Sequence, residues 1–147
     1  MNNTSKEFLA AQEEACKEPG TAYYFAKENK DADIKKCQEV ACKEHEYAYW
    51  FARNIKESNI KYCQEIACKD PEYAYCFVRD VKGAHIEYCQ EIACKDPCYA
   101  FLFAKHIKGA NIEYCQKATC KNPYWAKEFA LNIRGANKKK YKIYSIL

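Results

Sequence analysis

A repeat of 26 residues runs through most of the chain and constrains its fold more than any other feature. Three copies align without gaps, and two more divergent copies precede them, so that five copies occupy residues 8–137. They begin at Phe8, Ile34, Ile60, Ile86 and Ile112. Repeats of this length are typical of arrays in which each unit buries its apolar surface against its neighbours. The sequence therefore predicts a repeat array.

Each repeat carries the start and stop signals of two helices. Asp70 followed by Pro71 is an N-cap followed by proline at the first helical position, and this pattern recurs in the next two repeats. The proline helix that starts here is expected to run about twelve residues and to stop near Gly83. Asn59 is the expected N-cap of the other helix, the cysteine helix, which ends at Lys69. Neither helix is stable alone, so we predict an all-α fold, a twisted α-solenoid of stacked helical hairpins.

The two ends of the chain differ from the repeats. Residues 1–7 are expected to form an N-terminal cap, in which Thr4 and Glu7 fit a capping box for the first cysteine helix. Residues 138–147 carry four lysines and no cysteine, and we expect a basic C-terminal cap or tail there. The first residues lack a basic segment followed by an apolar one, so we expect no secretory signal in this chain.

Composition narrows the class of protein. Apolar residues make up 49% of the chain and aromatic residues 15%, which is too much for an intrinsically disordered protein. The longest uncharged apolar stretches are only a few residues long, so we predict no membrane span. The net charge of +4 neither requires nor excludes nucleic acid as a partner. Eleven cysteines in 147 residues is a density close to that of disulfide-rich scaffolds.

Nine of the cysteines fall on two positions of the repeat, five residues apart on the cysteine helix. The first position holds Cys37, Cys63, Cys89 and Cys115, and the second holds Cys16, Cys42, Cys68, Cys94 and Cys120. Five residues separate two Cα atoms by about 7.5 Å along a helix and by about 140° around it. That separation exceeds the reach of a disulfide. Identical positions in successive repeats point the same way, so they do not face each other either.

The remaining arrangement joins the second cysteine of one repeat to the first cysteine of the next, 21 residues later. The four predicted disulfides are Cys16–Cys37, Cys42–Cys63, Cys68–Cys89 and Cys94–Cys115. The first repeat has Ala11 at the first position, where a cysteine would have no preceding repeat to supply its partner, as this pairing requires. Cys120 would face Tyr141 and is predicted to be a free or intermolecular thiol.

Two further cysteines, Cys76 and Cys98, lie on the proline helices of adjacent repeats. A rotation of about 50° between repeats would bring them together, and we predict them as a fifth disulfide. Two alternatives to disulfides stay open. In the first alternative, the cysteines stay reduced and pack as small apolar residues. In the second, they bind zinc or copper(I) as thiolates, although zinc usually takes four ligands. We expect no metal site.

Residues suited to catalysis are few. His45, His85 and His106 replace proline, asparagine and aspartate of other repeats, which indicates positions at helix caps or on the surface. The sequence contains no glycine-rich phosphate loop, no GxSxG and no HExxH motif. We therefore predict no catalytic residue, no cofactor and no enzymatic activity.

Two other sets of residues recur in the repeats. One glutamine recurs at the same position of every cysteine helix, immediately before a Glu or Lys residue. It either forms an amide ladder between stacked helices or lies in solvent. A basic row near the C-terminal ends of the proline helices comprises Lys56, Lys82, Lys108, Arg134, Arg53 and Arg79. Basic residues beside aromatic ones occur in nucleic-acid-binding proteins. We favour the other interpretation, in which the aromatic residues form the core and the cations are solvated.

The segments KDPEYAYCFVRDVKGA and KDPCYAFLFAKHIKGA resemble short tandem repeats of about 26 residues found in uncharacterised proteins of phages and large DNA viruses. The resemblance covers nearly the whole chain and implies a helical-repeat fold without an established activity. The paired cysteines depart from the commoner form of these repeats. A looser resemblance is to Sel1-like cysteine-rich repeat proteins, whose repeats are longer and whose disulfides join helical pairs.

These observations predict a non-enzymatic structural or protein-binding module joined by disulfides, in an oxidising setting such as a virion or the extracellular space. Its expected partner is another protein or a further copy of itself, in a filament or a shell. Nucleic-acid binding through the basic row and metal binding by cysteine thiolates are the alternatives.

Overall fold

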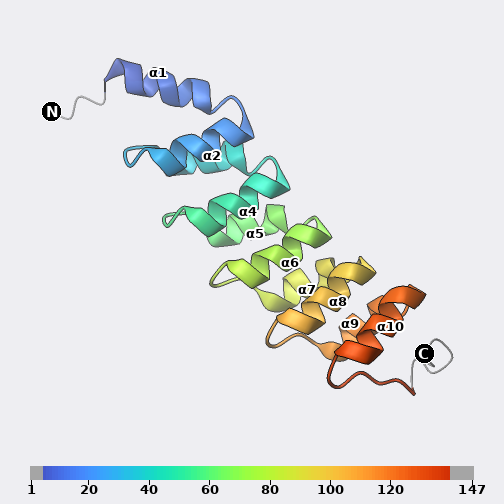
Figure 1. Cartoon of the computed structure of the whole chain (residues 1–147). Helices are drawn as coiled ribbons and strands as arrows, with labels where there is room; N and C mark the ends of the chain where they lie inside the picture. Colours follow the sequence, from blue (N-terminus) through green and yellow to red (C-terminus); the bar gives the residue numbers. More distant parts are fainter. Residues whose placement is uncertain (1–4, 140–147) are drawn as a thin grey trace. The chain divides into compact units, whose positions relative to one another are not determined.

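A computed structural model describes residues 5–139, and this part of the chain contains ten helices and no strand (Figure 1). Odd-numbered helices are the cysteine helices and even-numbered helices are the proline helices. Their bounds are α1 (Lys6–Ala15), α2 (Pro19–Glu28), α3 (Ile34–Ala41), α4 (His45–Asn54), α5 (Ile60–Ala67), α6 (Pro71–Asp80), α7 (Ile86–Ala93), α8 (Pro97–His106), α9 (Ile112–Thr119) and α10 (Pro123–Asn132). The predicted all-α fold is confirmed.

The chain divides into two compact units, Met1–Ala67 with α1 to α5 and Cys68–Leu147 with α6 to α10. Within each unit, a proline helix packs against the cysteine helix that follows it and against the next proline helix. In the first unit α2 packs on α3 and α4, and in the second unit α6 packs on α7 and α8. Each unit therefore has the repeating helix packing of an α-solenoid.

Polar side chains begin the helices as the sequence predicts. The Asp70 carboxylate accepts hydrogen bonds from the backbone N–H groups of Glu72 and Tyr73 at 2.9 and 3.2 Å. The Asn59 side chain accepts one from the backbone N–H of Tyr62 at 3.1 Å. Each bond satisfies a donor that the first helical turn leaves unpaired. Equivalent caps are formed by Asp33, His85, Asp96, Asn111 and Asn122.

The proline helices are shorter than predicted, because α6 has ten residues and ends at Asp80. The next residue, Val81, has an extended backbone (φ −106°, ψ 115°) and a buried side chain. Burying this apolar side chain requires the helix to end before Gly83. Gly83 lies in the turn that follows, with φ of +90°, a conformation that glycine adopts without steric cost.

The first helix also begins differently from the prediction. The Ser5 hydroxyl, instead of Thr4, caps α1 and accepts a hydrogen bond from the backbone N–H of Phe8 at 3.2 Å. The capping box of Thr4 and Glu7 is therefore wrong, because Glu7 is not the third residue after this cap. Most of the predicted C-terminal cap or tail, residues 140–147, lies outside the described residues.

Alanine and phenylalanine build the core between the helices. One phenylalanine of each proline helix from α4 onward is fully buried: Phe51, Phe77, Phe103 and Phe129. One alanine of every proline helix has no exposed surface: Ala22, Ala48, Ala74, Ala100 and Ala126. The small side chain lets neighbouring helices approach closely, so within each unit the core fixes the distance between successive repeats and thereby the positions of the cysteines.

Candidate functional site

The cysteines of adjacent repeats meet in four pairs. Two pairs lie in the first unit and two in the second. The Sγ to Sγ distances are 3.7 Å for Cys16 and Cys37, 3.6 Å for Cys42 and Cys63, 2.9 Å for Cys68 and Cys89, and 3.6 Å for Cys94 and Cys115. We call these eight residues the cysteine ladder. The partners predicted from the 21-residue spacing are thus the ones that the fold brings together.

The sulfur atoms of the cysteine ladder are thiols in this structure. Their separations exceed the sulfur–sulfur bond of about 2.0 Å, and each pair is at the distance of an S–H···S contact. Cys94 donates to Cys115, and in the other three pairs either sulfur can donate. The proximity of the partners is confirmed, whereas the disulfide bonds stay a prediction.

Helix ends place the two sulfur atoms of a pair. Cys94 is the C-cap residue of α7, and its backbone N–H donates to the Gln90 carbonyl at 2.9 Å. Cys115 is the fourth residue of α9 and is fully buried. The second cysteine of a repeat therefore ends one cysteine helix and faces the middle of the next. The same arrangement holds for Cys42, at the end of α3, and Cys63 in α5.

Burial and the partner thiol raise the pKa of one cysteine in each ladder pair, namely Cys37, Cys63, Cys68 and Cys94. Burial is the larger cause for Cys37, and together with the hydrogen bond to Cys16 it raises the pKa of Cys37 to about 12. For Cys63 and Cys68 the hydrogen bond to the partner thiol is the larger cause of the raised pKa, and burial adds to it. The same holds for Cys94. These thiols are protonated at neutral pH and react only after losing a proton.

A buried glutamine lies beside each ladder cysteine of the first position. The Gln38 side-chain oxygen accepts a hydrogen bond at 2.7 Å from the backbone N–H of Asn59, the N-cap of the next cysteine helix. Equivalent bonds join Gln12 to Asp33, Gln90 to Asn111 and Gln116 to Asn137. Both predicted alternatives, an amide ladder and a solvated side chain, are wrong, because the amide is buried and bonds to main chain. The offset is again 21 residues, which is the signal that we missed.

Aromatic rings join successive proline helices within each unit. The ring centroids of Tyr23 and Tyr47 lie 6.1 Å apart, and those of Tyr75 and Tyr99 lie 6.3 Å apart. Phe101 and Trp125 continue the series at 5.5 Å. Tyr23, Tyr49, Tyr75 and Phe101 are all buried. The predicted core position is confirmed for Tyr49, Tyr75 and Phe101, whose faces are not available for stacking with bases, whereas Trp50 and Trp125 are half-buried.

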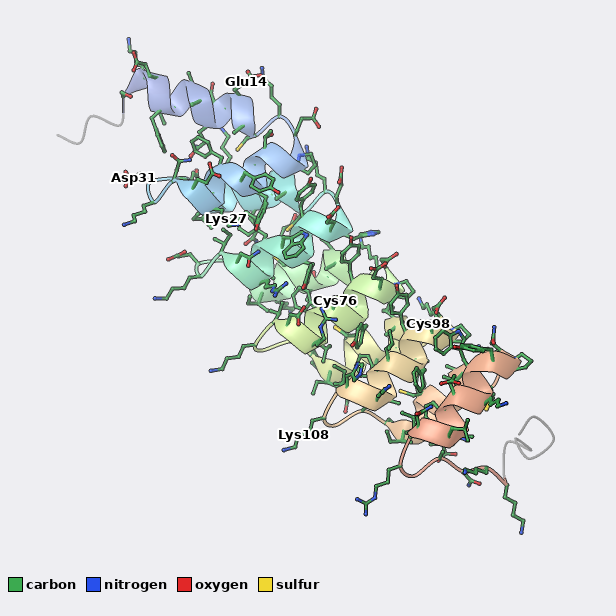
Figure 2. The ribbon with its side chains drawn as sticks, viewed as in Figure 1. Glu14, Lys27, Asp31, Cys76, Cys98 and Lys108 are labelled. Carbon is green, nitrogen blue, oxygen red and sulfur yellow. The ribbon has the colours of Figure 1, made fainter. Side chains whose placement is uncertain are left out.

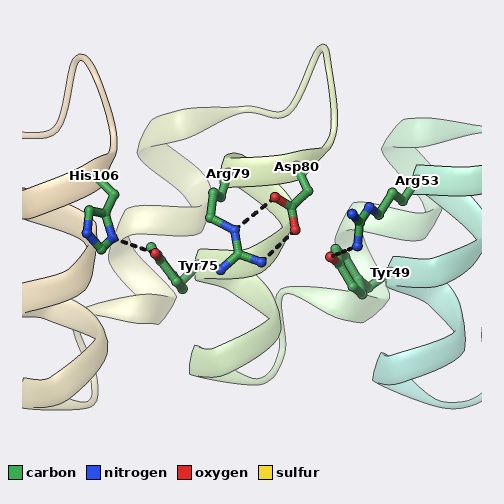
Figure 3. Close-up of polar contacts among 6 residues, drawn as sticks. All are labelled: Tyr49, Arg53, Tyr75, Arg79, Asp80 and His106. Atoms are coloured by element: carbon green, nitrogen blue, oxygen red, sulfur yellow. Dashed lines mark hydrogen bonds and ion pairs between the residues drawn. The ribbon is translucent and has the colours of Figure 1, made fainter.

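Two of the buried tyrosines have hydroxyl groups with polar partners on the next proline helix, which the sequence did not indicate. Asn54 donates to the Tyr23 hydroxyl at 2.8 Å, and the Tyr75 hydroxyl lies 2.7 Å from Nδ1 of His106 (Figure 3). Both contacts span 31 residues and join the last residue of a proline helix to the preceding proline helix. His106 therefore has a packing contact, and His85 caps α7. His45 is the first residue of α4.

The basic row is exposed, and two of its three arginines contact their own helices. The Arg53 guanidinium donates to the Tyr49 hydroxyl at 3.0 Å and lies 5.3 Å from the Trp50 ring. The Arg79 guanidinium donates twice to the Asp80 carboxylate, at 2.8 and 2.7 Å (Figure 3). The remaining members, Lys56, Lys82, Lys108 and Arg134, are exposed, and Figure 2 labels Lys108 on a turn of the second unit.

Three cysteines lie outside the ladder. Cys76 on α6 and Cys98 on α8 are both half-buried, and Figure 2 labels them on their helices. Their disulfide stays a prediction. Cys120, the C-cap of α9, is half-buried, and burial raises the pKa of its thiol. Its expected neighbour, Tyr141, lies outside the described residues.

Among residues 5–139, no group of three or more His, Cys, Asp or Glu side chains gathers as metal ligands would. No described helix has the length and apolar character needed to cross a membrane. No family model, curated protein or solved structure matches the chain.

Proposed function

We propose that this protein is a non-enzymatic repeat scaffold whose cysteine ladder closes into disulfides and whose exposed helix faces bind protein. The observation that carries the proposal is the ladder, in which four equivalent pairs of cysteines meet between adjacent repeats. Each pair would lose two protons and pass two electrons to a small disulfide such as oxidised glutathione, and one sulfur–sulfur bond would form. Each bridge closes a loop of about 20 residues and adds about 3 kcal/mol to the free energy of unfolding.

The setting follows from the chemistry of the bridges. Disulfides persist outside the reducing cytosol, so the proposal places the protein in an oxidising location, on a virion or outside the cell. The resemblance to tandem repeats of viral and phage proteins agrees with that location.

Exposed apolar side chains on α10 support a protein partner. Tyr124 and Leu131 are 62% and 59% exposed and stand seven residues apart, which places them on one face of this helix. Half-buried Trp125 lies beside Tyr124, with ring centroids 4.9 Å apart. Tyrosine, tryptophan and leucine on one face suit a protein partner better than a phosphate backbone. A second copy of the chain is one such partner, and a filament or shell would result from its repetition.

Nucleic acid is the less supported partner. The exposed lysines of the basic row suit phosphate contacts, but the neighbouring tyrosines and Phe101 are buried. With most rings beside the basic row buried, binding would rest mainly on charge and would fall steeply with salt. Absence of binding to single-stranded DNA or RNA in dilute buffer would remove this alternative.

The test of the scaffold is a thiol count. Protein purified without reductant is unfolded, alkylated at once and weighed as an intact chain, beside a sample that was reduced before alkylation. The four ladder disulfides leave three labelled thiols, or one if Cys76 and Cys98 are also joined. The reduced control carries eleven labels. Eleven labels in the untreated sample would overturn the proposal.

A further inference from the structure

The cysteine ladder offers a second chemistry when its thiols are reduced. We propose that each reduced pair binds one soft metal ion that takes two thiolate ligands in line, with Hg(II) as the probe that defines the site. This inference concerns the reduced chain and does not depend on whether disulfides form in the native setting.

The number of ligands selects the class of ion. A ladder pair supplies two sulfur atoms, and no third His, Cys, Asp or Glu joins a pair within residues 5–139. Structural zinc takes four ligands in a tetrahedron, so a ladder pair leaves zinc half-coordinated. Soft ions prefer thiolate ligands, and those that accept two ligands in line are satisfied by one pair.

The distances fit such a bridge after a small movement. A metal–thiolate bond is about 2.3 Å long, so a linear bridge separates its two sulfur atoms by about 4.6 Å. The pairs at 3.6 and 3.7 Å must widen by about 1 Å. The pair of Cys68 and Cys89, at 2.9 Å, must widen by about 1.7 Å. We therefore expect three tight sites and a weaker fourth.

Burial selects the charge of the ion. Cys63, Cys89 and Cys115 have no exposed surface, and a net charge at such a place is costly. A divalent ion displaces one proton from each thiol, the two protons pass to solvent, and the resulting bis-thiolate is neutral. No electron is transferred. Copper(I) would leave one negative charge per pair, so the ladder favours a divalent soft ion.

The experiment uses a ladder-only variant with Cys76→Ser, Cys98→Ser and Cys120→Ser, in which the ladder cysteines are the only cysteines left. The variant is reduced, desalted under argon and mixed with Hg(II) and excess glutathione, and native mass spectrometry counts the retained ions. We expect three retained ions, and a fourth only at lower glutathione, each adding its own mass less two protons. A further Cys63→Ser substitution should lower the count by one, because Cys42 alone does not outcompete glutathione.

Three results would overturn the inference. They are loss of all ions to glutathione, an unchanged count after Cys63→Ser, and equal retention of Zn(II). If the Cys63→Ser variant does not fold, X-ray absorption of the ladder-only variant still tests the inference. Two sulfur neighbours per mercury are expected, and three or four would contradict a pairwise site.

Discussion

The Sγ atom of Cys68 lies 2.9 Å from the Sγ atom of Cys89, closer than in the other three ladder pairs. A disulfide requires about 2.0 Å, so this pair must close by about 0.9 Å, whereas the others must close by about 1.6 Å. Both cysteines are fully buried, and packing opposes larger movements.

At redox equilibrium the Cys68–Cys89 bridge should therefore be the most stable of the ladder disulfides, because it needs the least movement. In glutathione buffers that oxidise the ladder only in part, linked-peptide mapping at equilibrium should find this bridge in several-fold excess over Cys94–Cys115, which lies in the same unit. Cys89→Ser provides the control, since it should remove this bridge without preventing the Cys94–Cys115 bridge. Equal yields of the two bridges would refute the ordering.

Alkali should destabilise the reduced protein more than the oxidised one. The folded state raises the pKa of Cys37 from 9.0 to about 12. Above pH 9 the unfolded chain releases thiol protons that the folded chain retains, so the free energy of unfolding falls as pH rises toward 12. Below pH 9 both states are protonated at this thiol and it contributes no slope. Urea unfolding at pH 8, 9.5 and 10.5 measures the effect.

The oxidised protein is the control for this pH dependence, because its ladder sulfurs carry no proton. Burial also raises the pKa of Tyr62 and Tyr99, and these tyrosines contribute to the slope in both forms. The difference between the two slopes therefore isolates the thiols. Identical slopes would contradict the assigned protonation of the ladder.

Replacing a buried glutamine should destabilise the stack. Gln90→Ala removes the acceptor for the Asn111 backbone N–H, now at 2.8 Å, and should lower the free energy of unfolding by about 1–3 kcal/mol. Glu91→Ala is the matched control, because Glu91 is the exposed neighbour in the same helix and should cost less than about 0.5 kcal/mol. Urea unfolding compares the two, and equal losses would show that the glutamine bond contributes nothing specific.

Ser58→Ala should stabilise the protein. The Ser58 hydroxyl is buried, and no partner for it exists among the described residues. The other four repeats have alanine at this position: Ala32, Ala84, Ala110 and Ala136. Removing an unsatisfied buried hydroxyl should raise the free energy of unfolding by about 1 kcal/mol. The reverse change Ala84→Ser should lower it by a similar amount, and a destabilised Ser58→Ala variant would contradict this account.

The sequence was sufficient to predict those features of the fold that follow from the translation between successive repeats. The five-residue spacing of Cys37 and Cys42 excluded a bridge within a helix. Because successive repeats are related by one operation, bridges between identical positions were excluded too, which left pairs such as Cys42 with Cys63. The N-caps at Asp70 and Asn59 were likewise predictable, since capping depends on residues within one helical turn.

Contacts between repeats were harder to predict where a side chain has several possible partners. The Gln38 amide can bond to another amide, to water or to main chain, and only the packed structure places the Asn59 N–H beside it. The end of α6 depends on the burial of Val81, which no local signal reports. The contact of Tyr75 with His106 joins two proline helices and has no counterpart where Phe101 replaces the tyrosine.

The connectivity of the cysteines in the purified protein decides whether the ladder closes into disulfides. Protein purified without reductant is alkylated under denaturing conditions and digested, and its linked peptides are identified by mass spectrometry. The account predicts bridges between the second cysteine of one repeat and the first cysteine of the next, at Cys16–Cys37, Cys42–Cys63, Cys68–Cys89 and Cys94–Cys115. Bridges between identical positions, such as Cys37–Cys63, or the absence of any bridge, would contradict it.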